Sequence, residues 1–255
     1  MSASTHIDNA ALFAVLSSLA DNKQMMGRRY ASWCNGAPAL EAAVAAAAMA
    51  QDELGHARTL YPLLEDFTQS EQAPEQVEPM TRTLHYNLSV LDNDFRGWSE
   101  FVAANFLFDT ALTTFFEAAQ HATSYEPMRQ RAFKIVQEEQ GHFVYGKGWL
   151  RRLARAGGAV RTTLIAALQC FWDETLCWFG PDDDAHMQRL YQEGIIDASP
   201  DELRDHYLQK IMPVLNELDL AFPVTFDTQT GIWQPTQALP WSKWDVEGRR
   251  WRGVP

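Results

Sequence analysis

A short internal repeat constrains the fold of this chain more than any other feature. Residues 51–56 read Gln-Asp-Glu-Leu-Gly-His and residues 137–142 read Gln-Glu-Glu-Gln-Gly-His, at an offset of 86 residues (137 minus 51). In both copies a glutamate precedes a histidine by three residues, so in an α-helix the two side chains lie on one face. Helical bundles that bind two metal ions through carboxylates have two such glutamate–histidine pairs directed at one point. The repeat therefore predicts a helical bundle with one shared polar site.

Apolar residues support a helical fold, because they recur at spacings of three and four residues over long stretches. This periodicity predicts four bundle helices, at about Asp8–Trp33, Leu40–Phe67, Phe95–His121 and Met128–Ala156. Turn sequences at 34–38 and 122–127 close two hairpins, and the polar stretch Thr68–Pro79 can cross between them. Two hairpins joined by one long connection form a ferritin-like four-helix bundle, so we predict an all-α protein of that class.

Beyond the fourth helix the chain divides into a helical part and a tail. Gly157 and Gly158 end the fourth helix, and further helices are predicted at Arg161–Phe179, Ala185–Glu193 and Pro200–Leu218. We therefore assign residues 1–220 to one ferritin-like helical domain. Residues 221–255 hold four tryptophans together with prolines and arginines but little periodicity. They are predicted to form an irregular tail that packs on the bundle or, in the alternative, on a partner.

The repeat also locates the residues that the other two helices contribute. In a helical hairpin, two residues at equal distances from the turn, one before it and one after it, lie at the same height. The partner of each motif glutamate is therefore the residue that lies equally far before the turn. In the second hairpin this residue is Asp109, 30 residues before Glu139 (139 minus 109). In the first hairpin it is Lys23, 30 residues before Glu53 (53 minus 23), so an ammonium stands at a ligand position. Asp21 is a poor substitute, because two helical residues turn about 200° away from the site.

The candidate metal ligands are Glu53, His56, Asp109, Glu139 and His142. A lysine ammonium about 4 Å from a divalent ion is disfavoured by roughly 8 kcal/mol at an effective dielectric constant of about 20. Lys23 could therefore act as a substitute cation that neutralises the carboxylates. A second alternative is one metal ion on Glu139 and His142 with a third ligand, and a third is that Lys23 points out of the bundle. Mixed imidazole and carboxylate ligands suit iron or manganese, so one or two iron ions are the cofactor to test.

Composition and charge exclude several functions. A net charge of −12 and a pI near 5.0 argue against a nucleic-acid partner, whose phosphates are bound by basic patches. Cys34, Cys170 and Cys177 have no zinc-binding spacing and fit reduced thiols. The longest apolar run, Ala42–Ala50, is far short of the roughly 20 residues that cross a membrane, and Met1–Ala10 lacks the features of a signal peptide. We expect a cytoplasmic protein with no membrane partner.

Several runs of sequence together carry a family resemblance. They are Leu19-Ala20-Asp21-Asn22-Lys23, Trp33, Gly36-Ala37-Pro38-Ala39-Leu40-Glu41, the run from Ala50 to Arg58, Phe108-Asp109, Ser124-Tyr125-Glu126-Pro127, and the Glu139 and His142 motif. Over about residues 8–220 this set resembles the phenylacetic acid catabolic family. Its members are the ferritin-like subunits of the multicomponent ring-1,2-phenylacetyl-CoA epoxidase.

The resemblance implies a function as well as a fold. The family has a catalytic subunit, which holds a diiron centre and binds the CoA thioester, and a non-catalytic partner of the same fold. The catalytic kind is expected to have glutamate where this chain has Lys23. The resemblance therefore implies a structural subunit with a degenerate dimetal site, bound to a homologous catalytic oxygenase subunit in a heterodimer or larger complex, or paired as a homodimer. The alternative is an iron-dependent diiron oxygenase or oxidase that acts on an aromatic, CoA-linked substrate.

Overall fold

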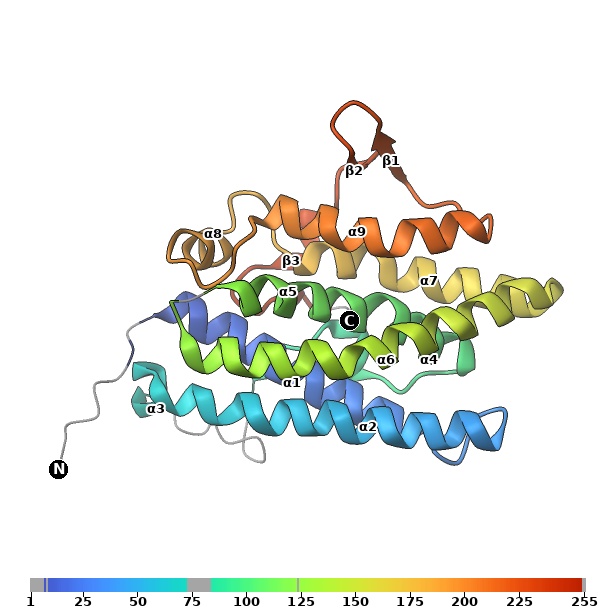
Figure 1. The fold of residues 1–255 in the computed structure, drawn as a ribbon, viewed down its shortest axis with the longest axis horizontal. Helices are drawn as coiled ribbons and strands as arrows, with labels where there is room; N and C mark the ends of the chain where they lie inside the picture. Colours follow the sequence, from blue (N-terminus) through green and yellow to red (C-terminus); the bar gives the residue numbers. More distant parts are fainter. Residues whose placement is uncertain (1–6, 8, 73–83, 123, 254–255) are drawn as a thin grey trace.

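The computed structural model describes residues 7, 9–72, 84–122 and 124–253, and its centre is a helical bundle (Figure 1). The first hairpin is formed by α1 (Ala10–Ala31) and α2 (Leu40–Leu60). The second is formed by α4 (Trp98–Ala104), which leads into α5 (Thr110–His121), and by α6 (Glu126–Ala156). Because α2 also packs beside α6, the two copies of the internal repeat face each other. The predicted pair of helical hairpins is confirmed.

The third bundle helix is interrupted, whereas the sequence predicted one continuous helix. Between α4 and α5 the chain makes a π-helical turn at Asn105–Asp109. Such turns widen the helix by one residue and change which side chains face inward. The helix also begins at Trp98 rather than Phe95, because Gly97 before it is extended, with φ −168°. The π-helical turn ends on Asp109, one of the predicted ligands.

The connection between the hairpins begins earlier than predicted. α2 ends at Leu60, where Pro62 in the following turn lacks a backbone donor. A 3-10 helix, η1, then spans Tyr61–Asp66. The predicted crossing segment Thr68–Pro79 begins with α3 (Thr68–Gln72), and its remainder from residue 73 lies outside the described residues. A short 3-10 helix, η3 (Ser89–Asp92), precedes α4.

Three helices follow the bundle, as predicted. They are α7 (Gly158–Trp178), α8 (Ala185–Gln192) and α9 (Pro200–Glu217). Gly157 and Gly158 have positive φ angles of 68° and 51°, which end α6 and allow α7 to start before the predicted Arg161. In Figure 1, α7 and α9 lie on the opposite side of α5 and α6 from α2. They therefore cover the second hairpin, whereas α1 of the first hairpin packs against α8 and η3.

The tail contains two short β-hairpins, which the sequence did not predict. β1 (Val224–Asp227) pairs antiparallel with β2 (Ile232–Pro235), and this hairpin projects beyond α9 (Figure 1). β3 (Trp244–Asp245) pairs antiparallel with β4 (Arg250–Trp251). Strands this short carry too few residues to show an alternating apolar pattern. An irregular tail was therefore predicted where paired strands exist.

The second hairpin of the tail is anchored in the chain's own helices. Arg249 is almost fully buried, and its guanidinium lies 3.1 Å from the buried Asp184 carboxylate. It also donates a hydrogen bond of 2.6 Å to the carbonyl of Trp178. Trp244 is buried as well. This part of the tail therefore packs on the helices.

The core between the helices is aromatic. The helical spacing of five phenylalanines predicts core positions, and all five are buried without exposed surface: Phe101, Phe106, Phe108, Phe115 and Phe116. Among the described residues, no helix combines the length and the apolar character that crossing a membrane requires. The apolar surface of the helices is instead buried within the bundle.

Gly146 on α6 allows a close approach to the π-helical turn, and this contact gives a testable prediction. A Cβ atom on Gly146 would lie 2.1 Å from Asn105 Oδ1, so Gly146→Ala should displace Asn105 and lower the free energy of unfolding by about 1–3 kcal/mol. Gly148→Ala on the same helix meets open space and should raise stability by up to about 1 kcal/mol. Urea unfolding of both variants is the measurement. Equal stability of the two variants would contradict the close contact.

Candidate functional site

A lysine side chain lies at the centre of the buried polar site. Lys23, from α1, has no exposed surface, so the alternative in which it points out of the bundle does not describe this structure. Its Nζ lies 2.6 Å from Glu139 Oε1, 2.9 Å from Asp109 Oδ1 and 3.1 Å from Glu53 Oε2. One ammonium therefore contacts a carboxylate from each of the other three bundle segments.

The charges in this cluster shift one another's ionisation. Burial alone would lower the pKa of Lys23, but the negative charges of Asp109, Glu139 and Glu53 raise it well above its usual value. Burial alone would raise the pKa of Glu139, but Lys23 and His142 hold it well below the usual range. Burial, together with the charge of Asp109, raises the pKa of Glu53 well above its usual value. Lys23 is therefore charged, and Glu53 gains a proton more readily than Glu139.

The two motif histidines are each held by an acid on the opposite helix. His142, on α6, has Nδ1 2.9 Å from Asp109 Oδ2 and Nε2 3.3 Å from Asp52 Oδ2 of α2. His56, on α2, has Nε2 2.8 Å from Glu138 Oε2 of α6. Each helix thus supplies a histidine to the site and an acid that orients the histidine of its neighbour.

The inner nitrogens of both histidines face the carboxylate cluster. His56 Nδ1 lies 3.2 Å from Glu139 Oε1, and His142 Nδ1 lies 3.2 Å from Glu139 Oε2. Burial alone would lower the pKa of His142, but the charges of Glu139 and Asp109 raise it far above its usual value. Both ring nitrogens of His142 face carboxylates, an arrangement that favours its protonated form.

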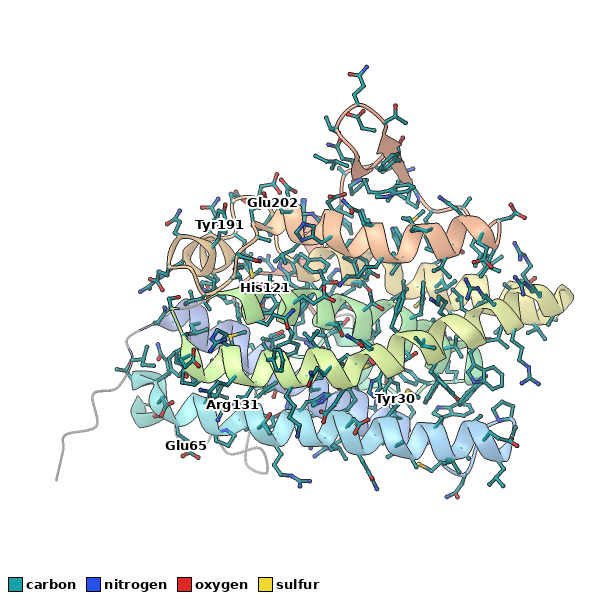
Figure 2. All side chains as sticks on the ribbon, viewed as in Figure 1. Tyr30, Glu65, His121, Arg131, Tyr191 and Glu202 are labelled. Carbon is teal, nitrogen blue, oxygen red and sulfur yellow. The ribbon has the colours of Figure 1, made fainter. Side chains whose placement is uncertain are left out.

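Four contributors to this site were missed by the sequence analysis. Asp52 and Glu138 occupy the same place in the two copies of the repeat. An acidic residue at this position in both copies was the pattern that could have identified them. Asn105 donates a hydrogen bond of 3.2 Å to Asp109 Oδ2. The hydroxyl of Tyr30, labelled in Figure 2, lies 3.5 Å from the same oxygen. These two residues come from single positions with no repeat partner to identify them.

Asp21 lies outside the cluster, as the helical geometry predicts. Its carboxylate accepts hydrogen bonds of 2.7 Å from the Tyr61 hydroxyl and 2.7 Å from the Tyr86 backbone amide. These groups belong to the connection between the hairpins. Asp21 therefore binds that connection to α1. The position that faces the carboxylate cluster is occupied by Lys23.

Four of the five predicted ligands lie close enough to share one metal ion. They are Glu53, Asp109, Glu139 and His142, each with one ligand atom within 4.8 Å of the others. The Nζ of Lys23 lies among the oxygens of the three carboxylates. A divalent ion beside that charge would be strongly repelled. A dimetal centre therefore does not fit these residues while Lys23 is charged.

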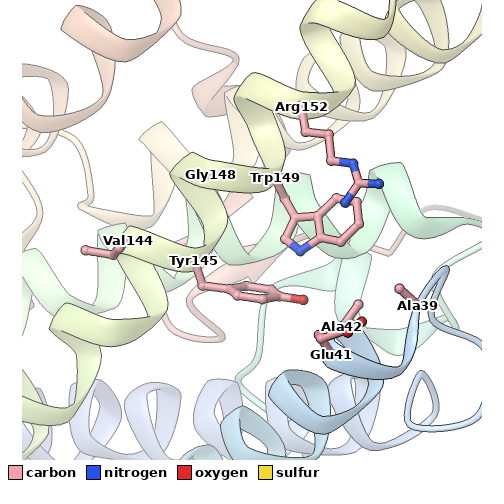
Figure 3. Close-up of a pocket in the computed structure, with 8 residues that line it drawn as sticks. All are labelled: Ala39, Glu41, Ala42, Val144, Tyr145, Gly148, Trp149 and Arg152. Atoms are coloured by element: carbon pink, nitrogen blue, oxygen red, sulfur yellow. The ribbon is translucent and has the colours of Figure 1, made fainter.

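A separate hollow lies between the start of α2 and the middle of α6 (Figure 3). Its volume is about 430 Å³, and Tyr145, Trp149 and Arg152 of α6 form one wall. The Arg152 guanidinium stacks over the Trp149 ring, 4.7 Å from the ring centroid. The residues around this hollow include none of the described cluster.

The family described as "Phenylacetic acid catabolic protein" matches residues 2–239. The chain belongs to this family. The match continues past residue 220, where the resemblance was expected to end, and includes the β1–β2 hairpin. Family membership confirms the ferritin-like class predicted for the bundle.

Two relatives of this chain are subunits of the 1,2-phenylacetyl-CoA epoxidase of Escherichia coli strain K12, lettered A and C. The one lettered A is 28% identical over 205 residues, which cover 78% of this chain and 65% of the relative. The one lettered C is 24% identical over 215 residues, which cover 84% of each chain. The aligned part therefore spans less than two thirds of the first relative. The chain is similar to both lettered subunits, and these similarities do not separate the two kinds.

Proposed function

We propose that this protein is the structural, non-catalytic subunit of a phenylacetyl-CoA epoxidase-type oxygenase in aromatic catabolism. The observation that carries the proposal is the buried Lys23 ammonium, which contacts all three carboxylates of the site. Lys23 offsets part of the negative charge of these carboxylates without a metal ion. Removing either sign of charge from such a buried cluster would leave the other uncompensated.

The proposed partner is a homologous catalytic subunit. Two relatives of this chain are named as subunits of a single epoxidase, which supports an assembly of related chains. In the proposed complex the catalytic subunit binds the aromatic CoA thioester and holds the iron, and this chain supports its fold in the cytoplasm. Co-expression should yield a heterodimer or a larger complex, which size-exclusion chromatography with light scattering measures.

An iron-dependent oxygenase or oxidase is the second candidate. The observation that favours it is that Glu53, Asp109, Glu139 and His142 still converge on one point. His56 also remains beside Glu139 and is oriented by Glu138. A protein that had lost every need for metal would be free to lose these ligands. The two candidates differ in whether the chain alone holds iron.

Metal content separates these two functions. The chain is expressed alone with added iron, and bound metals are measured by mass spectrometry. We expect no stoichiometric iron in the parent protein, because Lys23 occupies the cation position. Lys23→Glu should bind about two iron ions per chain, and iron should raise its melting temperature because the metal binds only the folded state.

A matched variant controls for the change of charge. Lys243→Glu makes the same substitution at an exposed position in the tail, away from the site, and should leave both metal content and iron-dependent stability unchanged. About two iron ions per chain in the parent protein would overturn the structural-subunit proposal. That result would establish the second candidate.

A further inference from the structure

One face of the first hairpin carries exposed apolar side chains. α2 packs on α1, on η1 and on α6, and on its remaining surface Leu40 is 77% exposed and Val44 is 62% exposed. Val144, on the neighbouring α6, is 62% exposed and lines the same hollow as the start of α2. Exposed apolar side chains that lie together are typical of surfaces that contact another protein.

The exposed residues of α2 form one stripe along the helix. They recur at alternating spacings of three and four residues, which keeps their side chains on one face. The hollow in Figure 3 is lined by Glu41 and Val144, and a second hollow of about 430 Å³ between α2 and α6 is lined by Gly55 and Arg58. The stripe therefore lies beside α6. Its residues are Glu41, Val44, Ala48, Gln51, Gly55 and Arg58.

The stripe is complementary to itself in the antiparallel direction. Glu41 and Arg58 are equally far from its middle. Val44 and Gly55 are also equally far from its middle. In a second copy that packs antiparallel about that point, each glutamate faces an arginine and each valine faces a glycine. The two inner residues of the stripe are uncharged, so like charges of the stripe do not meet.

Gly55 supports a close contact with another chain. In the interior of a helix, glycine is less favourable than alanine by about 1 kcal/mol. Packing against the described residues does not require a glycine, because a Cβ atom on Gly55 would meet no atom within 4 Å. A valine side chain from a second copy would occupy that space.

The same two-fold axis brings α6 of one copy to α6 of the other. Asp52 of α2 lies opposite His142 of the antiparallel α6. The middle of the stripe lies between two and three residues before Asp52, so the same height on α6 lies between two and three residues after His142, beside Val144. The exposed Val144 side chains of the two copies therefore meet near the axis.

We propose that the α2–α6 face binds a second copy of this chain, with each α2 antiparallel to the α2 of the other copy. The 21 residues of α2 extend about 31 Å, and two helices side by side are about 20 Å wide. This face of roughly 600 Å² is close to the surface of about 800 Å² that each partner contributes to a standard interface. Two-fold dimers, in which one face contacts itself, are the commonest oligomers. The interface goes beyond the proposed function, because it requires neither iron nor a catalytic subunit.

Sedimentation equilibrium of the whole chain, expressed alone, tests the association. We expect a dimer at micromolar concentrations, with twice the mass of one chain, which is 28.9 kDa. A monomer throughout that range would overturn the proposal. So would a chain that is a monomer alone and associates only with a different, co-expressed subunit. Neither outcome alters the iron content that tests the proposed function.

Gly55→Trp tests the contact between valine and glycine. It places an indole where Val44 of the second copy packs, and the two-fold symmetry repeats the clash. The open space beside Gly55 in its own chain should leave the fold unchanged, which circular dichroism checks. The dissociation constant of the dimer should rise about 100-fold or more. Gly253→Trp, at an exposed tail residue with equally open surroundings, is the matched control and should dimerise like the parent protein. Equal dimerisation of Gly55→Trp would refute this interface.

Charge reversal tests the antiparallel alignment. Glu41→Arg brings arginines together at both ends of the stripe, and Arg58→Glu brings glutamates together. Each single variant should raise the dissociation constant about tenfold. The double variant should restore the parent value, because the facing charges are again opposite. Both residues are exposed, so the fold of each chain should be unaffected. A double variant that dimerises no better than the single variants would overturn the alignment.

Discussion

Replacing Lys23 by methionine is expected to lower the free energy of unfolding by about 3–5 kcal/mol. Methionine retains the length of the side chain, so the packing changes little. The loss arises because Glu53, Asp109 and Glu139 would remain buried without the ammonium that contacts all three. Urea unfolding monitored by circular dichroism at pH 7 is the measurement. Lys243→Met, at an exposed position in the tail, is the matched control and should have little effect.

The loss in Lys23→Met should grow with pH. Burial raises the pKa of Glu53, and the charge of Lys23 opposes that shift. Without Lys23 the folded-state pKa rises further above the unfolded value, so the folded protein binds more protons than the unfolded one. Stability then falls as pH rises from the unfolded pKa through the folded pKa. A variant that loses equal stability at pH 4.5 and pH 8 would contradict this charge-based explanation.

Replacing Arg249 by methionine is expected to lower the free energy of unfolding by a similar amount, about 3–5 kcal/mol. The guanidinium lies 3.1 Å from Asp184, and both side chains are buried. The other carboxylate oxygen of Asp184 already accepts from the backbone at the start of α8. The variant therefore leaves one buried oxygen without its charged partner. Urea unfolding gives the loss directly.

Arg252→Met is the matched control for the tail. Arg252 is exposed, and its backbone amide, which donates to the Lys243 carbonyl at 2.7 Å, is unchanged by the substitution. This variant should unfold like the parent protein. If Arg249→Met were no less stable than Arg252→Met, the tail would contribute nothing to the stability of the helices. That result would favour the alternative in which the tail packs on a partner.

The position of the polar site could be predicted because a repeat and two turns fix it. Lys23 and Asp109 were located by their equal distances from the turns of two hairpins, and the structure brings both to the carboxylates of Glu53 and Glu139. Antiparallel helices with similar turns keep residues at matching heights. The π-helical turn that ends on Asp109 does not remove it from the site.

The contacts that could not be predicted join residues without a shared pattern. Arg249 and Asp184 are 65 residues apart, and no periodicity links a tail to the start of a helix. The π-helical turn has no residue signature, because ordinary helix-compatible residues form it. Asp52 and Glu138 each reach a histidine on the opposite helix, and a helical pattern gives the face of a residue but not the length of its reach. Tertiary packing decided each of these cases.

The histidine–acid contacts between α2 and α6 also determine how the two antiparallel helices can be aligned. Asp52 lies opposite His142, and His56 lies opposite Glu138, one helical turn further along. A slip of one turn in one direction would bring Asp52 to Glu138, and a slip in the other direction would bring His56 to His142. Either misalignment loses both attractive contacts and places like groups together. The acid–histidine contacts therefore disfavour shifted alignments of α2 and α6.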